Sequence, residues 1–237
     1  MRTTQHRAGY WAACAGIALA LAAGASSAGL LGPTPYLQQS DSPFFPFTGF
    51  TYFYLEDFED HALNTPGLVN NGSGGPTSVV FGASIHDSVD ADDGAIDGSG
   101  LNGDSFFESD GSVSFSFDPL VLGALPNAVG IVWTDGSQGP NNTITFEAFD
   151  QNNVSLGVLQ GNHADFSFNG DTAEDRFYGA TNAGGISRIV MSNSPAIEID
   201  HVQYGLRGEA PPLPEPASLL LLGVALGALG FARRGCG

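Results

Sequence analysis

The sequence predicts an all-β fold, an antiparallel β-sandwich, on three observations. Short segments in which apolar and polar residues alternate recur from Thr51 onward. Turns rich in glycine, asparagine and aspartate separate these segments. No amphipathic helical pattern of about ten residues occurs between residues 51 and 207. We therefore expect one sandwich domain over residues 51–207.

The first half of this domain contains two clear strand patterns. Residues 51–55 form a β-branched and aromatic run, Thr-Tyr-Phe-Tyr-Leu. Residues 112–117 alternate strictly, which places Val113, Phe115 and Phe117 on one face. Proline-rich residues 29–50 precede the domain and predict an extended leader or an irregular first edge.

The second half of the domain supplies the remaining strands. They are expected at residues 128–134, 143–149, 154–159, 177–179, 186–191 and 197–204. The apolar run 128–134 should end in a turn at Asp135 and Gly136, and its Trp133 should be buried. Residues 143–149 and 154–159 flank an Asp-Gln-Asn-Asn turn and predict a hairpin.

The last predicted strand has a break in its alternation. Ile197 and Ile199 share one face, whereas Val202 and Tyr204 belong to the other. A β-bulge near Asp200 and His201 would turn all four apolar side chains inward. We therefore expect an irregular last strand with a bulge at this point.

The N-terminus has the layout of a secretory signal peptide, residues 1–28. A short basic start is followed by an apolar stretch rich in alanine and leucine, and then by small residues. Cleavage is expected between Ala28 and Gly29, with a cut after Ala25 as the alternative. Both cysteines, Cys14 and Cys236, lie in the terminal segments, so the domain contains no disulfide.

The C-terminus combines three features in order. A proline-rich linker, residues 208–213, leads to Pro214-Glu215-Pro216, an uncharged stretch 217–232 and the pair Arg233-Arg234. A helix of that length spans roughly 24 Å, short of a hydrocarbon core of about 30 Å. It can span by thinning the bilayer, and the two arginines would stay on the cytoplasmic side.

These three features at the extreme C-terminus resemble the PEP-CTERM sorting signal of Gram-negative bacteria. The resemblance covers residues 214–237 and implies recognition by exosortase, a membrane-embedded cysteine protease, in organisms that make exopolysaccharide. It implies an exported protein of the cell envelope, outer surface or extracellular space, transiently or stably anchored by the helix. An ordinary membrane anchor is the alternative, and it also places the domain outside the cytoplasm.

The charge balance of the chain is strongly acidic. All twenty-five acidic residues lie between residues 29 and 216, together with three of the seven basic residues. Nucleic acid is not expected as a partner, because binding to polyanions depends on Lys and Arg. Hard divalent cations such as calcium are the natural counter-charge. The alternative is that the acids keep an exported protein soluble.

The densest acidic cluster lies in residues 87–98, where five aspartates stand among glycines. Such crowding is costly unless a cation or bulk water relieves the repulsion. Asp90, Asp92 and Asp97 are the candidate calcium ligands. The spacing does not match an EF-hand loop, and a solvated acidic loop is the alternative.

The order of the strands from Phe58-Glu59-Asp60 to Ile197-Glu198-Ile199-Asp200 is similar to that of jelly-roll ectodomains found ahead of PEP-CTERM signals. Calcium-stabilised members often pair a carboxylate of the first strand with one of the last. The resemblance thus implies a structural calcium ion between Glu59, or neighbouring Asp57, and Asp200. A pair of exposed acids is the alternative.

The sequence favours a non-enzymatic surface or matrix protein that binds exopolysaccharide with calcium. The second hypothesis is a glycan-active hydrolase or lyase, although the sequence has neither a Gly-x-Ser-x-Gly elbow nor histidines at metal-ligand spacing. The third is an ice-binding or adhesive protein, which would normally show threonine-rich repeats that this chain lacks. No catalytic residue is assigned.

Overall fold

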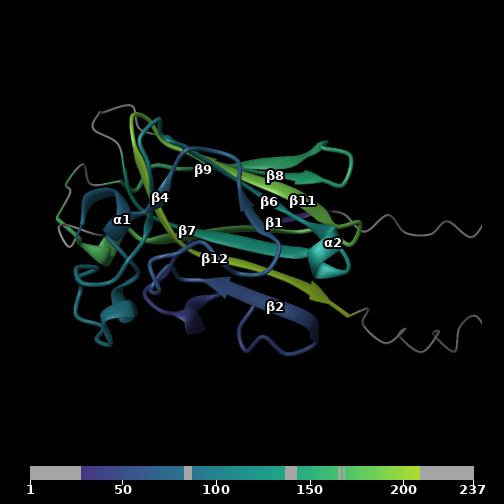
Figure 1. Ribbon diagram of the computed structural model, residues 1–237, viewed down its shortest axis with the longest axis horizontal. Coiled ribbons are helices and arrows are strands. Elements are labelled where there is room, and N and C mark those ends of the chain that lie inside the picture. Colours follow the sequence, from purple (N-terminus) through teal and green to yellow (C-terminus); the bar gives the residue numbers. More distant parts are fainter. Residues whose placement is uncertain (1–27, 83–86, 137–142, 165–166, 168, 209–237) are drawn as a thin grey trace, which may run out of the picture.

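The computed structural model describes residues 28–82, 87–136, 143–164, 167 and 169–208, which form two antiparallel sheets packed against each other (Figure 1). The predicted signal peptide, apart from Ala28, and the tail 214–237 with its predicted helix lie outside the described residues. The first strand begins at Gly29, the residue after the expected cleavage point. In the described part of the chain, no helix is long and apolar enough to cross a membrane.

The first sheet is built around its longest strand, β12. Its strands are β1 (Gly29–Pro35), β2 (Phe50–Glu56), β4 (Gly75–Pro76), β5 (Phe106–Glu108), β7 (Ala128–Gly136), β10 (Arg176–Thr181) and β12 (Ile197–Arg207). Their order is β1-β10-β7-β12-β5-β4. Strand β5 pairs with the start of β12, and β2 pairs with its second half from Val202 onward.

The second sheet has the order β3-β6-β11-β8-β9. Its strands are β3 (Leu68–Asn70), β6 (Ser112–Phe117), β8 (Ile144–Asp150), β9 (Ser155–Gly161) and β11 (Ile186–Ser192). The connections hold two short helices, α1 (Thr77–Phe81) and α2 (Pro119–Leu122), and three 3-10 turns, η1 (Gln39–Asp41), η2 (Asp90–Asp93) and η3 (Thr172–Glu174).

The connectivity is that of a jelly roll. From β6 to β12 the chain crosses repeatedly between the sheets, and β12 inserts between β7 on one side and β2 and β5 on the other. Every pair of neighbouring strands is antiparallel. The predicted fold class is therefore confirmed.

The alternation patterns correctly predicted the faces of the strands. Val113, Phe115 and Phe117 are buried in the main core between the sheets, and so is Trp133. The predicted hairpin is the β8–β9 pair. The turn expected at Asp135 and Gly136 is wrong, because β7 lies between β10 and β12 and continues through residue 136.

The bulge expected in the last strand is confirmed. The register of β12 against β7 shifts between Asp200 and Gln203, and His201 has a left-handed φ of 44°. As a result Ile197, Ile199 and Val202 share the main core with Tyr204. Asp200 and the residue after it are turned toward the outer side of the first sheet.

Residues 29–50 form the irregular first edge that was one of the two expectations for this segment. Strand β1 pairs with β10, and the segment after it covers the outer side of the first sheet. There Tyr36 and Phe44 form a second core with Val132 and Phe177. The first sheet is consequently buried on both faces, which explains the continuous apolar run in β7.

Candidate functional site

One end of the sandwich gathers most of the buried acids of the described chain. We call it the carboxylate end; it comprises the start of β12, the end of β7, and residues 56–65, 73–78, 87–108 and 170–175. The acids there that are 5% exposed or less are Glu56, Asp87, Asp90, Asp104, Glu108, Asp135, Glu174, Asp175 and Asp200. A buried charge is costly unless hydrogen bonds or a counter-ion compensate for it, so the partners of each carboxylate indicate its role.

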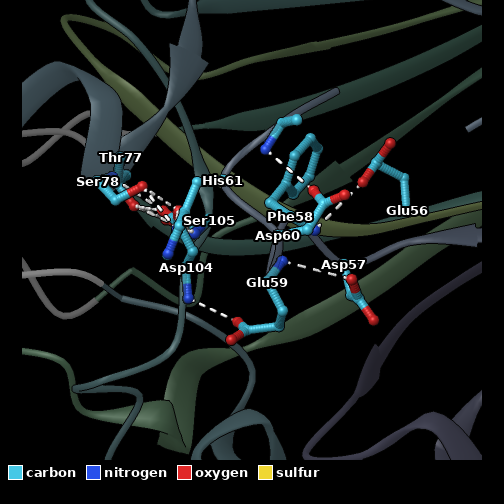
Figure 2. Close-up of polar contacts among 11 residues, drawn as sticks. Glu56, Asp57, Phe58, Glu59, Asp60, His61, Thr77, Ser78, Asp104 and Ser105 are labelled. Carbon is cyan, nitrogen blue, oxygen red and sulfur yellow. Dashed lines mark hydrogen bonds and ion pairs between the residues drawn. The ribbon is translucent and has the colours of Figure 1, made fainter. Parts of the chain in front are cut away.

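Glu56 anchors the loop that carries the predicted ligand Glu59 (Figure 2). Its carboxylate accepts hydrogen bonds from the backbone N–H groups of Phe58, Asn64 and Thr65 at 2.9 to 3.3 Å. The hydroxyl of Thr65 donates a further bond at 3.0 Å. Phe58 is fully buried with a left-handed φ of 56°, a conformation that the loop imposes and Glu56 supports.

The Asp104 carboxylate likewise accepts hydrogen bonds from several donors (Figure 2). It accepts from the Thr77 hydroxyl at 2.5 Å, the Ser78 backbone N–H at 2.9 Å and His61 Nδ1 at 2.8 Å. Burial alone would raise the pKa of Asp104, but these hydrogen bonds outweigh it and lower the pKa. Ser78 and Asp104 both contact the same ring nitrogen of His61, Nδ1. The relay of a serine hydrolase needs the serine and the aspartate on different nitrogens, so these three residues do not form one.

The predicted ligands Asp90 and Asp97 belong to no group of clustered ligand atoms. The Asp90 carboxylate accepts from the backbone N–H groups of Asp97, Gly98 and Ser99 at 3.0 to 3.3 Å, so it caps its own loop. The Asp97 side chain is exposed. Only Asp92 among the three loop candidates belongs to a group of clustered ligands.

Asp92, Asp200 and His201 form that group, and their ligand atoms lie within 4.8 Å of one another. Turn η2 supplies Asp92, whereas the bulge of β12 supplies the other two. The Asp200 carboxylate accepts from the backbone N–H groups of Val89 at 3.0 Å and His201 at 2.6 Å. Burial and the neighbouring Asp92 raise the pKa of Asp200 well above its usual value. One Asp92 oxygen is buried without a hydrogen-bond partner among the described residues.

A chain of hydrogen bonds fixes the His201 ring. The Ser42 hydroxyl donates to Gln203 Oε1 at 2.6 Å, and Gln203 Nε2 donates to the Tyr36 hydroxyl at 2.9 Å. The Tyr36 hydroxyl is 2.9 Å from His201 Nδ1. Burial raises the pKa of Tyr36, so the hydroxyl keeps its proton and donates it to this nitrogen. His201 then carries its proton on Nε2, which lies 3.1 Å from Asp92 Oδ1.

Glu59 lies near this group without belonging to it. Strands β2 and β12 are neighbours, as the jelly-roll resemblance required, and Glu59 follows the end of β2. Its carboxylate accepts from the Asp104 backbone N–H at 2.6 Å. Burial, followed by the charges of Asp92 and Asp57, raises the pKa of Glu59 to about 7. Asp57 is not part of a ligand group.

A second group, Asp87, Asp135 and Glu174, was not predicted. Its ligand atoms also lie within 4.8 Å of one another, and all three side chains are buried. Glu198 is adjacent: it accepts from the Asp87 backbone N–H at 3.2 Å, and burial and the charge of Asp135 raise its pKa to about 8. The available signal was Asp135, directly after the apolar run of β7, but the sequence pattern predicted a turn at this position.

The comparisons with known proteins do not extend this description. No protein-family model matches the chain, and no curated protein is similar to it.

Proposed function

We propose that this chain is an exported, non-enzymatic jelly-roll protein of the cell surface or extracellular matrix, whose fold is completed by a calcium ion at Asp92 and Asp200. A PEP-CTERM signal at residues 214–237, processed by an exosortase-type protease, would deliver it there. The predicted signal peptide, the proline-glutamate-proline tripeptide and the terminal arginines support export.

The observation that carries the calcium proposal is the pairing of the Asp92 and Asp200 carboxylates. Both side chains are largely excluded from water, and the charge of Asp92 raises the pKa of Asp200. A divalent cation between them would convert this repulsion into attraction. It would also tie η2 to the central strand of the first sheet, a cross-link that a domain without disulfides lacks.

The ligand chemistry favours calcium over other common metals. Carboxylate oxygens are hard ligands, and calcium accepts irregular sets of six to eight oxygens at about 2.3–2.6 Å. His201 offers one nitrogen to this group, but that nitrogen already donates to Asp92 in the tautomer derived above. We therefore assign calcium binding to Asp92 and Asp200. Glu59 is a nearby acid that interacts electrostatically with Asp92, and its negative charge would add to the attraction for the ion.

For the polysaccharide we propose the outer face of the second sheet. One row across the strands joins Ser112, Ser192 and Thr145, and another places Ser116 beside Arg188. These hydroxyl groups alternate with the buried core residues, so they face away from the other sheet. A flat surface rich in hydroxyl groups suits hydrogen bonding to sugar hydroxyls along an extended chain.

The decisive experiment is thermal unfolding of the full-length protein in mild detergent, with a chelator or with millimolar calcium. We expect calcium to raise Tm by about 5 °C or more, because it binds the native state alone. Asp92→Asn should show a smaller shift than the wild type, whereas Asp97→Asn, which removes an exposed carboxylate of the same loop, should keep the full shift. Equal Tm values with and without calcium would contradict the proposal.

The polysaccharide part has its own test. Binding of the purified protein to the exopolysaccharide of a PEP-CTERM-encoding bacterium should fall at least about tenfold when Ser114 and Ser116 are both replaced by Glu. The control is Ser109→Glu, which adds one negative charge in the turn after β5, away from this face. A polysaccharide that binds the wild type and the double variant equally would exclude this face.

A further inference from the structure

We propose that Asp87, Asp135 and Glu174 form a second calcium site, separate from the one at Asp92 and Asp200. It would join three segments that are far apart in the sequence: the loop before η2, the end of β7 and turn η3. The proposal does not depend on the first site, because it uses none of its residues.

The geometry allows one ion to touch all three carboxylates. Their ligand atoms lie within 4.8 Å of one another. Two oxygens bound to the same calcium ion can be separated by up to about 5 Å, given the usual calcium–oxygen distances. The three side chains are 2%, 3% and 5% exposed, so bulk water does not screen their charges.

A second observation comes from turn η3 itself. Asp175, directly after Glu174, is fully buried, and neither of its carboxylate oxygens has a hydrogen-bond partner among the described residues. Thr172 is 1% exposed, and its hydroxyl is in the same situation. Buried polar atoms are almost always satisfied, so these oxygens point to a missing ligand.

Asp175 also lies against the group. Asp87 and Glu174 are the charged groups that act most strongly on Asp175. The Arg176 guanidinium offsets this repulsion only in part, because its hydrogen bonds go to the backbone carbonyls of Ala173 and Asp175, at 2.9 and 2.7 Å, and not to the carboxylates. A bound cation would lower the free energy of all four acids at once.

The ligand set selects the class of metal. The group consists of three carboxylates, and turn η3 adds the carboxyl group of Asp175 and the hydroxyl of Thr172. All of these are hard oxygen donors, with no sulfur or imidazole among the named residues. Calcium tolerates this irregular arrangement better than magnesium, which requires a near-ideal octahedron and retains its water. We therefore expect calcium to bind and magnesium to bind weakly.

The test is calcium stoichiometry in the full-length protein in mild detergent, measured by equilibrium dialysis after chelator treatment. Asp135→Asn should bind one calcium ion fewer per chain than the wild type, and Glu174→Gln provides a second variant at the same site. Asp92→Asn reports on the first site, and Asp97→Asn is the control for an exposed acid. Circular dichroism verifies that each variant is folded.

Thermal unfolding supplies a readout that simple damage to the fold would not produce. Without calcium, Asp135→Asn should melt at a higher temperature than the wild type, because one of the repelling charges is removed. With calcium it should gain less, since a ligand is lost. Damage to packing would lower Tm under both conditions.

The outcomes separate the two sites. Loss of one ion in Asp135→Asn and Glu174→Gln, with Asp92→Asn losing another, supports both. Unchanged stoichiometry in Asp135→Asn and Glu174→Gln overturns this inference, and a loss confined to Asp92→Asn leaves the proposed function standing. Loss in the first two variants alone supports the second site and overturns the first.

Discussion

The two ends of the sandwich are held together by different chemistry. At the end opposite the carboxylates, Asn127 exchanges two side-chain hydrogen bonds with the backbone of Arg207, at 2.7 and 3.0 Å. Its backbone carbonyl accepts from Asn182, whose side chain donates to Gly185. In Figure 1 this end carries α2, whereas α1 marks the carboxylate end.

The difference between the two ends indicates which side chains would depend on calcium. Neutral amides satisfy one another and need no ion. At the other end some acids, such as Glu56 and Asp104, are equally well satisfied by N–H and O–H donors. Asp92, Asp175 and Asp200 are left with mutual repulsion or unsatisfied oxygens. Only acids with mutual repulsion or unsatisfied oxygens should be stabilised by a cation.

The largest effect is expected from Glu56→Ala. The substitution leaves several buried N–H groups without an acceptor and should destabilise the protein by about 3 kcal/mol or more. The loss should be the same with calcium and with chelator, because Glu56 already has its partners. Urea unfolding measures this, with Glu147→Ala on the outer side of β8 as the control. A loss that depends on calcium would place Glu56 among the ion ligands.

Asn127→Ala tests the opposite end. It removes both contacts with the Arg207 backbone and should cost about 1–2 kcal/mol, since these bonds are partly exposed to water. Its effect should also be independent of calcium. If the size of the calcium shift in Tm changed in this variant, the two ends would be coupled and the comparison would fail.

The pH dependence sharpens the comparison further. The folded-state pKa values of Glu59 and Glu198, about 7 and about 8, lie above the unfolded value, so their contribution to stability is present at low pH. It is lost as the pH rises through 7 and 8. Without calcium, Tm should therefore fall by a few degrees between about pH 5 and pH 8. Asp104 and Glu108, with lowered pKa values, matter only below this window.

Calcium should flatten that profile, because a cation favours the ionised carboxylates. Differential scanning fluorimetry across this range, with calcium or chelator, measures both curves. A calcium-free Tm that rose steadily from pH 5 to pH 8 would show that the buried acids are not repelling one another in the folded state.

The smallest effect is expected at His61. Its ring lies on the surface and pairs with Asp104, which raises the pKa of His61. Asp104 retains the Thr77 and Ser78 donors when the ring is removed. His61→Asn, which tolerates the left-handed backbone at this position, should leave Tm unchanged within error. A clear loss would mean that the carboxylate end depends on this surface ion pair.

Local patterns predicted the parts of the fold that local rules govern. The slip in parity between Ile199 and Val202 was sufficient to locate the bulge that positions Asp200 and His201. Alternation likewise predicted the faces of β6. These features depend on the period of a strand and on little else.

The sequence could not distinguish the roles of the acids. Asp90 and Asp92 belong to one short 3-10 turn, in which their side chains point in different directions. The first accepts hydrogen bonds from its own loop, whereas the second lies against Asp200 and His201 of β12. Asp87, Asp135 and Glu174 are brought together only by the sheet order. That order was not predictable from the spacing of residues along the chain.

The position of β12 has a consequence for biogenesis. The strand that organises the first sheet is the last of the described strands to be synthesised, and β2, β5 and β7 all need it as a neighbour. The sandwich therefore cannot close until nearly all of the described chain has left the ribosome. On the proposed export route, the polypeptide would remain threadable through a translocation channel, and folding would follow on the outer side of the membrane.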